Sequence, residues 1–149
     1  MEIQPIGIVR SPVAEPVEEK WGDVVSEIHV DAAFASGLKG IESWSHVVVV
    51  YHMHEATFDL EADLVSRPGD RADMPEVGVF AQRTRTRPNA IGVAAAEVLK
   101  VEGSVLTVRR LDAIDGTPVL DIKPYASIYD TVSEPLIPIW FIRFMQGYF

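Results

Sequence analysis

Cysteine is absent from this chain of 149 residues. Without thiols, neither a disulfide nor a thiolate metal site can form, and a reducing compartment is the simplest setting. Long apolar runs are also absent, because the longest one, Val47–Tyr51, is far too short to cross a bilayer. The first residues have neither a basic start nor an apolar core, so we expect no signal peptide. These absences predict a soluble, cytoplasmic protein without a membrane partner.

Positive charge is scarce and unevenly placed. Lys and Arg number 13 against 22 Asp and Glu, which gives a formal net charge of −9. Such a chain is ill suited to a long duplex, because binding to phosphates depends on Lys and Arg. Three arginines nevertheless lie at alternate positions of one short segment, namely Arg83, Arg85 and Arg87. An acidic body with one basic patch favours a local anionic ligand.

Strand signals dominate the sequence. Apolar residues make up 48% of the chain, enough for the core of a single domain covering residues 1–149. Seven short segments have the apolar content or the two-residue period of strands: Ile6–Val9, Val24–Val30, Ser45–His54, Val77–Arg83, Ile91–Leu99, Ser104–Leu111 and Val119–Ile122. Glu102-Gly103-Ser104 is a hairpin turn signal between two of them. This pattern predicts a mostly β fold, either a barrel or a sandwich.

Local composition refines three segments. Val47–Val50 is a run of valines, typical of a strand that is buried on both faces. Asp31 is placed to cap a short helix over Ala32–Leu38. The C-terminal segment 126–149 ends in many aromatic residues, and we expect this tail to be buried on its own domain or on a partner subunit.

The segment that contains the three arginines has two interpretations. In an extended chain, residues i, i+2 and i+4 share a face, so the three guanidinium groups would point the same way. Like charges repel unless an anion lies among them, and the planar guanidinium suits phosphate and carboxylate. Pro88-Asn89 is a turn pair, and Gly92 permits close backbone approach. The alternative is a solvated edge strand whose arginines pair with nearby acids.

Two clusters of polar side chains are of types that are used in binding and catalysis. The loop Asp112–Pro118 holds two acids that suit ribose hydroxyls or an ammonium group, although its Asp-Gly pair is also a common turn. Asp121, Lys123 and Tyr125 would share a face at a strand end and could handle a proton. The alternative for this second cluster is a surface salt bridge beside a core strand.

Two histidines complete the candidates. His52 and His54 would face the same side of a strand, which is compatible with a metal ion. No third ligand is evident, and the nearby acids have no recognisable spacing. We therefore expect no metal site, and a pocket-lining or backbone-bonded role for these histidines.

Five motifs occur in one order along the chain and together point to a family. They are Ile6-Gly7-Ile8-Val9-Arg10-Ser11-Pro12, Gly40-Ile41-Glu42-Ser43-Trp44-Ser45-His46, Gly78-Val79-Phe80-Ala81-Gln82-Arg83, Arg87-Pro88-Asn89-Ala90-Ile91-Gly92 and the run from Leu111-Asp112-Ala113 to Lys123-Pro124-Tyr125. In order and wording, this set resembles the TsaA-like (TrmO) family of tRNA methyltransferases.

The resemblance implies a small closed or nearly closed antiparallel β-barrel with short helices, unlike Rossmann methyltransferases. It implies a homodimer, with the tail 126–149 as a candidate for the interface. It also implies an S-adenosylmethionine cofactor whose methyl group passes to N6 of threonylcarbamoyladenosine at position 37 of tRNA. Carried over to matching positions, the cofactor pocket would contain His54, Glu55, Arg83, Asp112, Ala113, Ile114 and Asp115.

Roles toward the acceptor follow as hypotheses from the same resemblance. Arg85, Arg87 and Asn89 are the candidate substrate residues, and the two arginines would hold RNA phosphate or the threonyl carboxylate. The proton that leaves N6 would pass to one of three residues that the sequence does not rank: Tyr125, Lys123 or Asp115.

Three positions depart from the usual motifs of the family. Ala90 replaces a proline, and Gln82 and Thr84 stand where a threonine and a serine are usual. These departures concern the acceptor more than the cofactor. Three alternatives therefore stay open: a methyltransferase of the same fold with another RNA or small-molecule acceptor, a non-catalytic module that binds S-adenosylmethionine, and a metal-dependent hydrolase that uses the two histidines.

Overall fold

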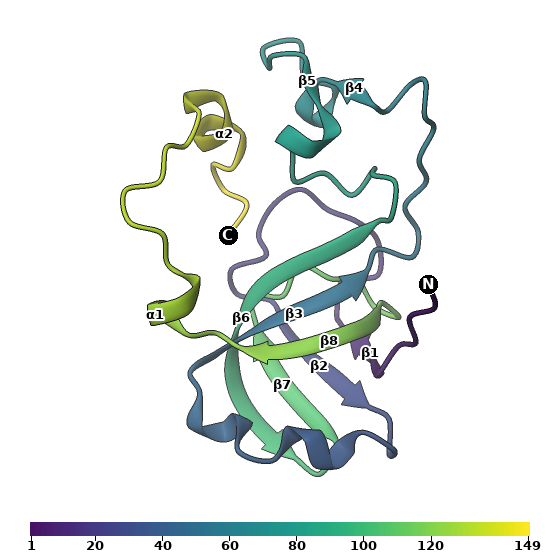
Figure 1. Ribbon diagram of the computed structural model, residues 1–149, viewed down its shortest axis with the longest axis vertical. Helices are drawn as coiled ribbons and strands as arrows, with labels where there is room; N and C mark the ends of the chain where they lie inside the picture. Colours follow the sequence, from purple (N-terminus) through teal and green to yellow (C-terminus); the bar gives the residue numbers. More distant parts are fainter.

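Alternating apolar side chains fold six segments of the chain into a closed antiparallel barrel. The computed structural model describes residues 1–149. The barrel strands are β1 (Gly7–Arg10), β2 (Val25–Val30), β3 (His46–His52), β6 (Ile91–Glu102), β7 (Val105–Arg109) and β8 (Pro118–Pro124). Their order around the barrel is β1-β2-β7-β6-β3-β8, and every neighbouring pair is antiparallel (Figure 1). The predicted β-barrel, non-Rossmann fold is confirmed.

The barrel interior is filled by matched large and small side chains on β3 and β6. Val47 and Val49 are fully buried and pair with Ala96 and Ala94 of β6, so small residues face branched ones across the interior. The intervening valines of β3 are only half-buried. The expectation of a strand buried on both faces is therefore wrong, because the outer face of a barrel strand meets only loops and solvent.

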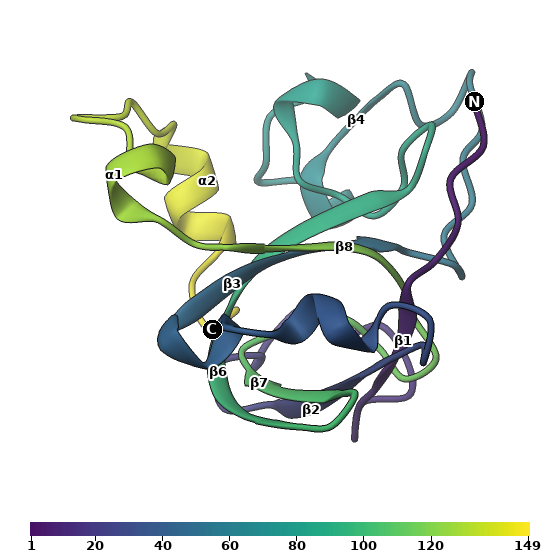
Figure 2. The same ribbon diagram turned by 60° about the horizontal axis from the view of Figure 1, so that its bottom comes forward.

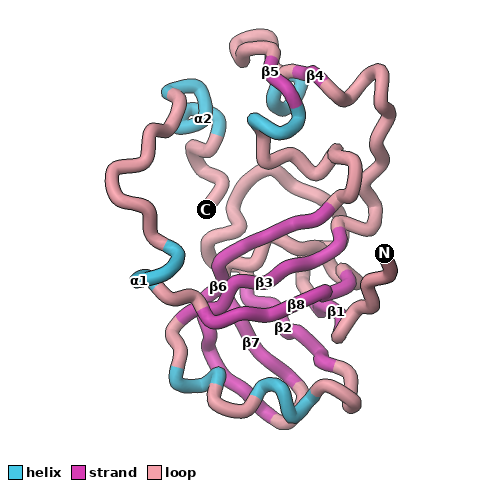
Figure 3. Tube along the Cα trace, in the orientation of Figure 1, coloured by secondary structure: helices cyan, strands magenta, loops and turns pink.

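A long excursion joins β3 to β6 and lies beyond one end of the barrel, where Figure 3 shows mainly loop. It contains β4 (Val65–Ser66), the 3₁₀ turns η3 (Pro68–Asp70) and η4 (Val79–Ala81), and β5 (Val77–Gly78), which pairs with β4. The predicted strand Val77–Arg83 is thus wrong beyond Gly78. Val79–Ala81 forms the turn η4 instead, with Val79 buried. The alternating Arg and Thr residues from Arg83 onward offer no apolar face to bury, so nothing holds them in a sheet.

The opposite end of the barrel is covered by two 3₁₀ turns, η1 (Ala35–Leu38) and η2 (Ile41–Ser43), which lie across it in Figure 2. Leu38 is buried there as part of the core. The helix expected over Ala32–Leu38 is therefore shorter and tighter than predicted, and Asp31 does not cap it. A glycine at its third position weakens a longer α-helix.

The C-terminal segment leaves β8, forms α1 (Ser127–Asp130) and α2 (Ile139–Phe144), and then returns to the barrel (Figure 1). Its outer part is solvent-exposed, since Ile128 and Leu136 have relative exposures of 100% and 101%. No side chain of the segment is fully buried: Trp140, Phe144 and Tyr148 are half-buried, so the expected burial of the tail is met only in part. Its place at a dimer interface stays a prediction. No helix of the protein has the length and apolarity needed to cross a membrane.

Candidate functional site

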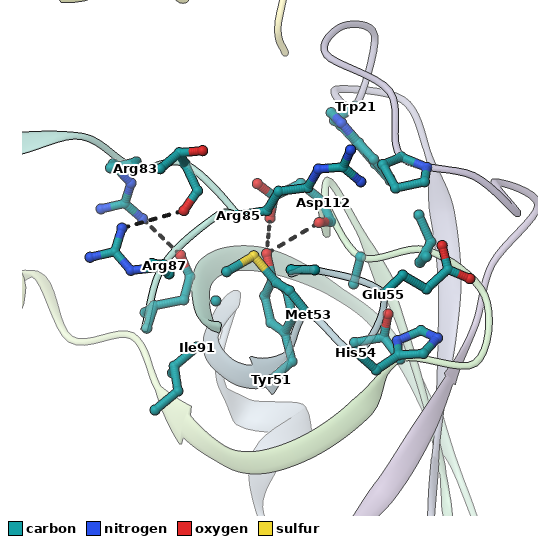
Figure 4. A pocket seen from close by; sticks show the side chains of 18 of the residues that line it. Trp21, Tyr51, Met53, His54, Glu55, Arg83, Arg85, Arg87, Ile91 and Asp112 are labelled. Atoms are coloured by element: carbon teal, nitrogen blue, oxygen red, sulfur yellow. Dashed lines mark hydrogen bonds between the residues drawn. The ribbon is translucent and has the colours of Figure 1, made fainter. Parts of the chain in front are cut away.

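One end of the barrel opens into a cleft. The antiparallel pairing of β3 and β6 places His52 opposite Ile91, so the end of β3 and the start of β6 meet there. The cleft has a volume of about 280 Å³, just below the range of about 300–1,000 Å³ that is usual for small-molecule sites. Its walls come from the loop before β2, the end of β3, the segment after η4, the start of β6 and the loop before β8 (Figure 4). Tyr148 of the C-terminal segment also lines it.

Tyr51 forms the floor of the cleft. Tyr51 is the second-last residue of β3, and its buried side chain points inward. The ring lies directly over Gly92, its partner across the sheet, and any Cβ at that position would overlap the ring. The close approach predicted at Gly92 is therefore present, and the group that approaches is the tyrosine ring.

Asp112 is held by two phenols. Its Oδ1 accepts a hydrogen bond from the Tyr51 hydroxyl at 2.8 Å, and its Oδ2 accepts one from the Tyr148 hydroxyl at 2.8 Å. Burial, and then the nearby negative charge of Asp112, raise the pKa of both phenols far above the usual value of about 10. Both therefore stay protonated and donate to the carboxylate throughout the physiological pH range.

The three arginines differ in what they bond. Arg83 donates to the carbonyl of Val93 at 2.8 Å. Arg87 donates through Nη1 to the carbonyls of Gln82 and Thr84, so its guanidinium ties together the turn from which it projects. Arg85 lines the cleft and makes no hydrogen bond or ion pair within the protein.

No carboxylate neutralises these arginines. None of the three lies within ion-pair distance of an acidic side chain, so the alternative of an edge strand paired to local acids is wrong. Asp112 and Glu55, which also line the cleft, likewise have no cationic partner. Unpaired charges of both signs thus face one small space, between apolar walls that include Met53 and Ile91 (Figure 4). This arrangement fits a ligand that carries both positive and negative groups.

Most of the sequence-predicted binding residues meet in this cleft. They are His54, Glu55, Arg83, Asp112, Ala113 and Ile114, together with Arg85 and Arg87. Asn89 lies outside, in the exposed turn before β6. Asp115 also lies outside: its Oδ1 accepts the backbone N–H of Ser11, and Arg10 lies 3.8 Å from its Oδ2.

Two candidates for the proton acceptor lie far from the cleft. The backbone N–H of Tyr125 bonds His46, at the start of β3, whereas Tyr51 lies near its end. Five residues of strand separate these points, or about 16 Å. Lys123 forms an ion pair with Asp121, as the alternative interpretation expected. A single protomer therefore does not bring Tyr125 or Lys123 to the cleft.

The histidines do not form a metal cluster. His52 is the last residue of β3, and His54 lies beyond it in a turn, so the strand alternation that would align them ends between the two. No group of three or more metal-ligating side chains comes together in the structure.

Sequence reasoning missed several residues that line the cleft: Pro16, Val17, Trp21, Tyr51, Met53, Ile91 and Tyr148. For Tyr51 a signal existed, because an aromatic residue at the end of a core strand needs a space such as the one over Gly92. For Tyr148 no local signal exists, since it lies 36 residues from Asp112 in the sequence.

The sequence profile of the tRNA-methyltransferase O N-terminal domain matches residues 11–131. The chain belongs to this family. A crystal structure of TrmO from Pseudomonas aeruginosa superimposes with a TM-score of 0.75 at 29% identity, and covers 93% of this chain and 62% of that one. Both findings confirm the resemblance that the five sequence motifs indicated.

Relatives within the family have two kinds of name. An S-adenosyl-L-methionine-binding protein of Archaeoglobus fulgidus is 41% identical over 138 residues, which cover 90% of this chain and 96% of the relative. The tRNA (adenine(37)-N6)-methyltransferase of Escherichia coli is 33% identical over 144 residues, which cover 89% of this chain and 61% of the relative. The chain spans only 38% of a longer A. fulgidus relative with the same 41% identity.

Proposed function

We propose that this protein is an S-adenosylmethionine-dependent methyltransferase that acts on N6 of adenosine 37 of tRNA, in the form of threonylcarbamoyladenosine. Support comes from family membership, from the names of the relatives, and above all from one observation. Carboxylates and guanidinium groups that have no ion-pair partner in the protein share a cleft at the end of the barrel. A tRNA substrate would place this activity in the cytoplasm.

The cleft residues fit the methyl donor by charge and polarity. The donor carries a sulfonium, an ammonium and a carboxylate, besides a ribose and a flat base. Asp112 and Glu55 offer acceptors for the cations or the ribose hydroxyls, and Arg83 offers a donor for the carboxylate. Met53 and Ile91 provide apolar surface for the base. Each part of the donor therefore has a chemical counterpart among the residues that line the cleft.

The bound donor supplies an electrophilic methyl group: a C–N bond forms, a C–S bond breaks, and N6 releases a proton. The protein's task is to hold the reacting groups in line and close together. Tyr51 and Tyr148 fix the orientation of Asp112. Of the side chains that line the cleft, His54 and Glu55 are the exposed proton acceptors, and we place the proton on one of them instead of on Tyr125, Lys123 or Asp115.

Arg85 is the residue best placed to receive the acceptor. It is exposed, lines the cleft and has no partner in the protein, so its guanidinium is available for a phosphate or for the carboxylate of the threonyl group. The target base must also leave its stack to enter the cleft, which is least costly in a single-stranded loop.

We further propose that the protein is a homodimer joined through its C-terminal segment. Large apolar side chains are exposed along this segment, including Ile128, Tyr129, Leu136 and Ile139. A patch of this kind marks an interaction surface. Sedimentation of the protein and of Leu136→Glu tests this proposal: we expect a dimer and a monomer, respectively, and a monomeric parent protein would contradict it.

The decisive test of the activity is mass spectrometry of nucleosides from tRNA incubated with the protein and labelled S-adenosylmethionine. Two substrates are compared, a tRNA that carries threonylcarbamoyladenosine and the same sequence with plain adenosine 37. We expect label on N6 of the first only. Label on both would support adenosine 37 as the target without the threonylcarbamoyl requirement, and label on neither would reject tRNA methylation.

A second candidate is a non-catalytic module that binds S-adenosylmethionine. The names of several relatives favour it, because they state binding alone. Calorimetry separates the two: binding of the donor without turnover on any tRNA would support the module, and no binding at all would reject both functions.

A further inference from the structure

The C-terminal segment enters the candidate site. After α2 the chain returns to the loop before β2, where Lys20 donates its backbone N–H to Gly147 at 3.0 Å and Trp21 donates to Tyr148 at 2.8 Å. The guanidinium of Arg110 lies 3.9 Å from the centre of the Phe149 ring. These contacts anchor the segment on both sides of Tyr148.

Close packing reinforces this anchor. A Cβ at Gly22 would lie only 2.8 Å from the carbonyl carbon of Phe149, so the backbone of the segment lies directly against this glycine. The neighbouring Trp21 is almost completely buried, at 2% exposure. The position of Tyr148 is therefore fixed by backbone bonds and packing, independently of any ligand.

From this anchored position, the Tyr148 hydroxyl reaches into the cleft and bonds Oδ2 of Asp112. The other carboxylate oxygen is already bonded to Tyr51. With one phenol on each oxygen, the carboxylate plane cannot rotate without breaking a hydrogen bond. If Tyr51 were the only partner, the carboxylate could rotate and move Oδ2 while keeping its bond through Oδ1.

We propose that Tyr148 is a positioning residue of the ligand site: it orients the Asp112 carboxylate toward the bound methyl donor from a segment outside the barrel. This inference rests on the proposed function, because it assumes that the donor binds in this cleft. The hydroxyl, and not the bulk of the ring, carries the role.

Calorimetric titration with S-adenosylmethionine tests the proposal in the full chain. Tyr148→Phe removes only the hydroxyl, whereas Tyr148→Leu also removes the ring. We expect Tyr148→Phe to weaken donor binding about five- to tenfold, the effect of losing one typical hydrogen bond, because the hydroxyl acts on the donor only through Asp112. Tyr148→Leu should weaken it little further. Ser36→Ala, which removes an exposed hydroxyl at the opposite end of the barrel, is the control and should bind like the parent protein.

A double-mutant cycle with Asp112→Asn shows whether Tyr148 acts through Asp112. In the Asp112→Asn background, we expect Tyr148→Phe to change affinity less than twofold, because there is no longer a carboxylate to orient. If Asp112→Asn abolishes measurable binding, the comparison of Phe with Leu at position 148 decides alone.

The failures are distinguishable. If the parent protein does not bind the donor, both the proposed function and this inference are overturned. If the parent protein binds and Tyr148→Phe binds equally well, only the inference is overturned. Loss with Tyr148→Leu but not with Tyr148→Phe, or an equal loss with and without Asp112, would assign the residue to packing and also overturn it.

Discussion

The Tyr51 hydroxyl lies 2.8 Å from Oδ1 of Asp112 and 3.1 Å from the backbone oxygen of the same residue. One phenol thus ties the end of β3 to the loop that precedes β8, at the floor of the cleft. The two residues are 61 positions apart in the sequence, and no backbone pairing between strands joins them. This side-chain bond therefore holds the two segments together at the cleft.

Tyr51→Phe keeps the ring over Gly92 but removes both of these hydrogen bonds. We expect the free energy of unfolding to fall by about 1–2 kcal/mol, since the half-buried carboxylate of Asp112 loses a partner. Urea unfolding at neutral pH measures the change. Ser36→Ala, which removes an exposed hydroxyl in η1, is the control and should leave stability unchanged. Equal stability of the Tyr51→Phe and parent proteins would contradict the role given to this bond.

Alkaline pH should destabilise the protein through the two buried phenols. Their pKa values are raised in the folded state, so the native protein keeps protons that the unfolded chain releases near pH 10, roughly the ordinary value. The unfolded state then binds fewer protons, and stability falls as pH rises above about 10, by up to roughly 1.4 kcal/mol per pH unit for each phenol.

Spectrophotometric titration of phenolate checks this expectation. The chain has four tyrosines, and all four should ionise after unfolding in denaturant. In the native protein, Tyr51 and Tyr148 should ionise only when the fold is lost. Tyr51→Phe and Tyr148→Phe should each remove one such delayed phenol; a native titration that releases all four protons near pH 10 would contradict the structure.

Arg85 and Arg87 should respond differently to truncation. Arg85→Ala removes a side chain without a partner, so we expect unchanged stability, weaker tRNA binding and a salt dependence reduced by about one charge. Arg87→Ala breaks two hydrogen bonds to the turn, so it should lower stability by about 1–2 kcal/mol and disturb donor binding as well. Filter binding at several salt concentrations and thermal unfolding provide the measurements. Identical behaviour of the two variants would refute this division.

Gly92→Ala should displace the Tyr51 ring that forms the floor of the cleft. The added methyl group would overlap the Tyr51 ring, which must move and lose its bonds to Asp112. We expect a loss of about 1–3 kcal/mol, typical of overpacking, together with weaker donor binding. Gly37→Ala is the matched control, because nothing lies within 4 Å of a Cβ there. The expectation fails if both glycine variants unfold at the same denaturant concentration as the parent protein.

Ala90 should tolerate glycine but not proline. Its φ is +46°, and its backbone N–H donates to Arg87 at 3.1 Å. Proline fixes φ near −65° and has no N–H, so Ala90→Pro should lower stability by about 2–3 kcal/mol although it restores the residue usual in the family. Ala90→Gly should raise stability by about 0.5–1 kcal/mol by relieving the left-handed conformation. Thermal unfolding of both variants measures the contrast, and a proline variant as stable as the parent would show that the local backbone differs from the one described.

Much of the barrel could be predicted from local pattern. Strand periodicity located all six barrel strands, and Ala94 and Ala96 lie in a strand despite their helix propensity, because they face Val49 and Val47 across the interior. The arginine segment was harder. Alternation predicted an extended strand, but a segment without apolar residues on one face has nothing to bury, and hydrogen bonds from Arg87 shape it as a turn instead.

The sequence by itself determined a β-barrel of a recognisable family and the types of charge at its site. It could do so because the alternation of apolar residues and the residue order within a motif are local properties. Only the tertiary structure decided which charged residues share one cleft. Tyr125 and Lys123 lie away from the cleft because the end of β8 pairs with the start of β3, at the other end of the barrel. The sequence alone does not show which ends of two strands lie side by side. Tyr148 reaches the cleft because the C-terminal segment folds back onto the loop before β2. Its hydrogen bond to Asp112 spans 36 residues, so it depends on the path of the folded chain and has no periodic signal in the sequence.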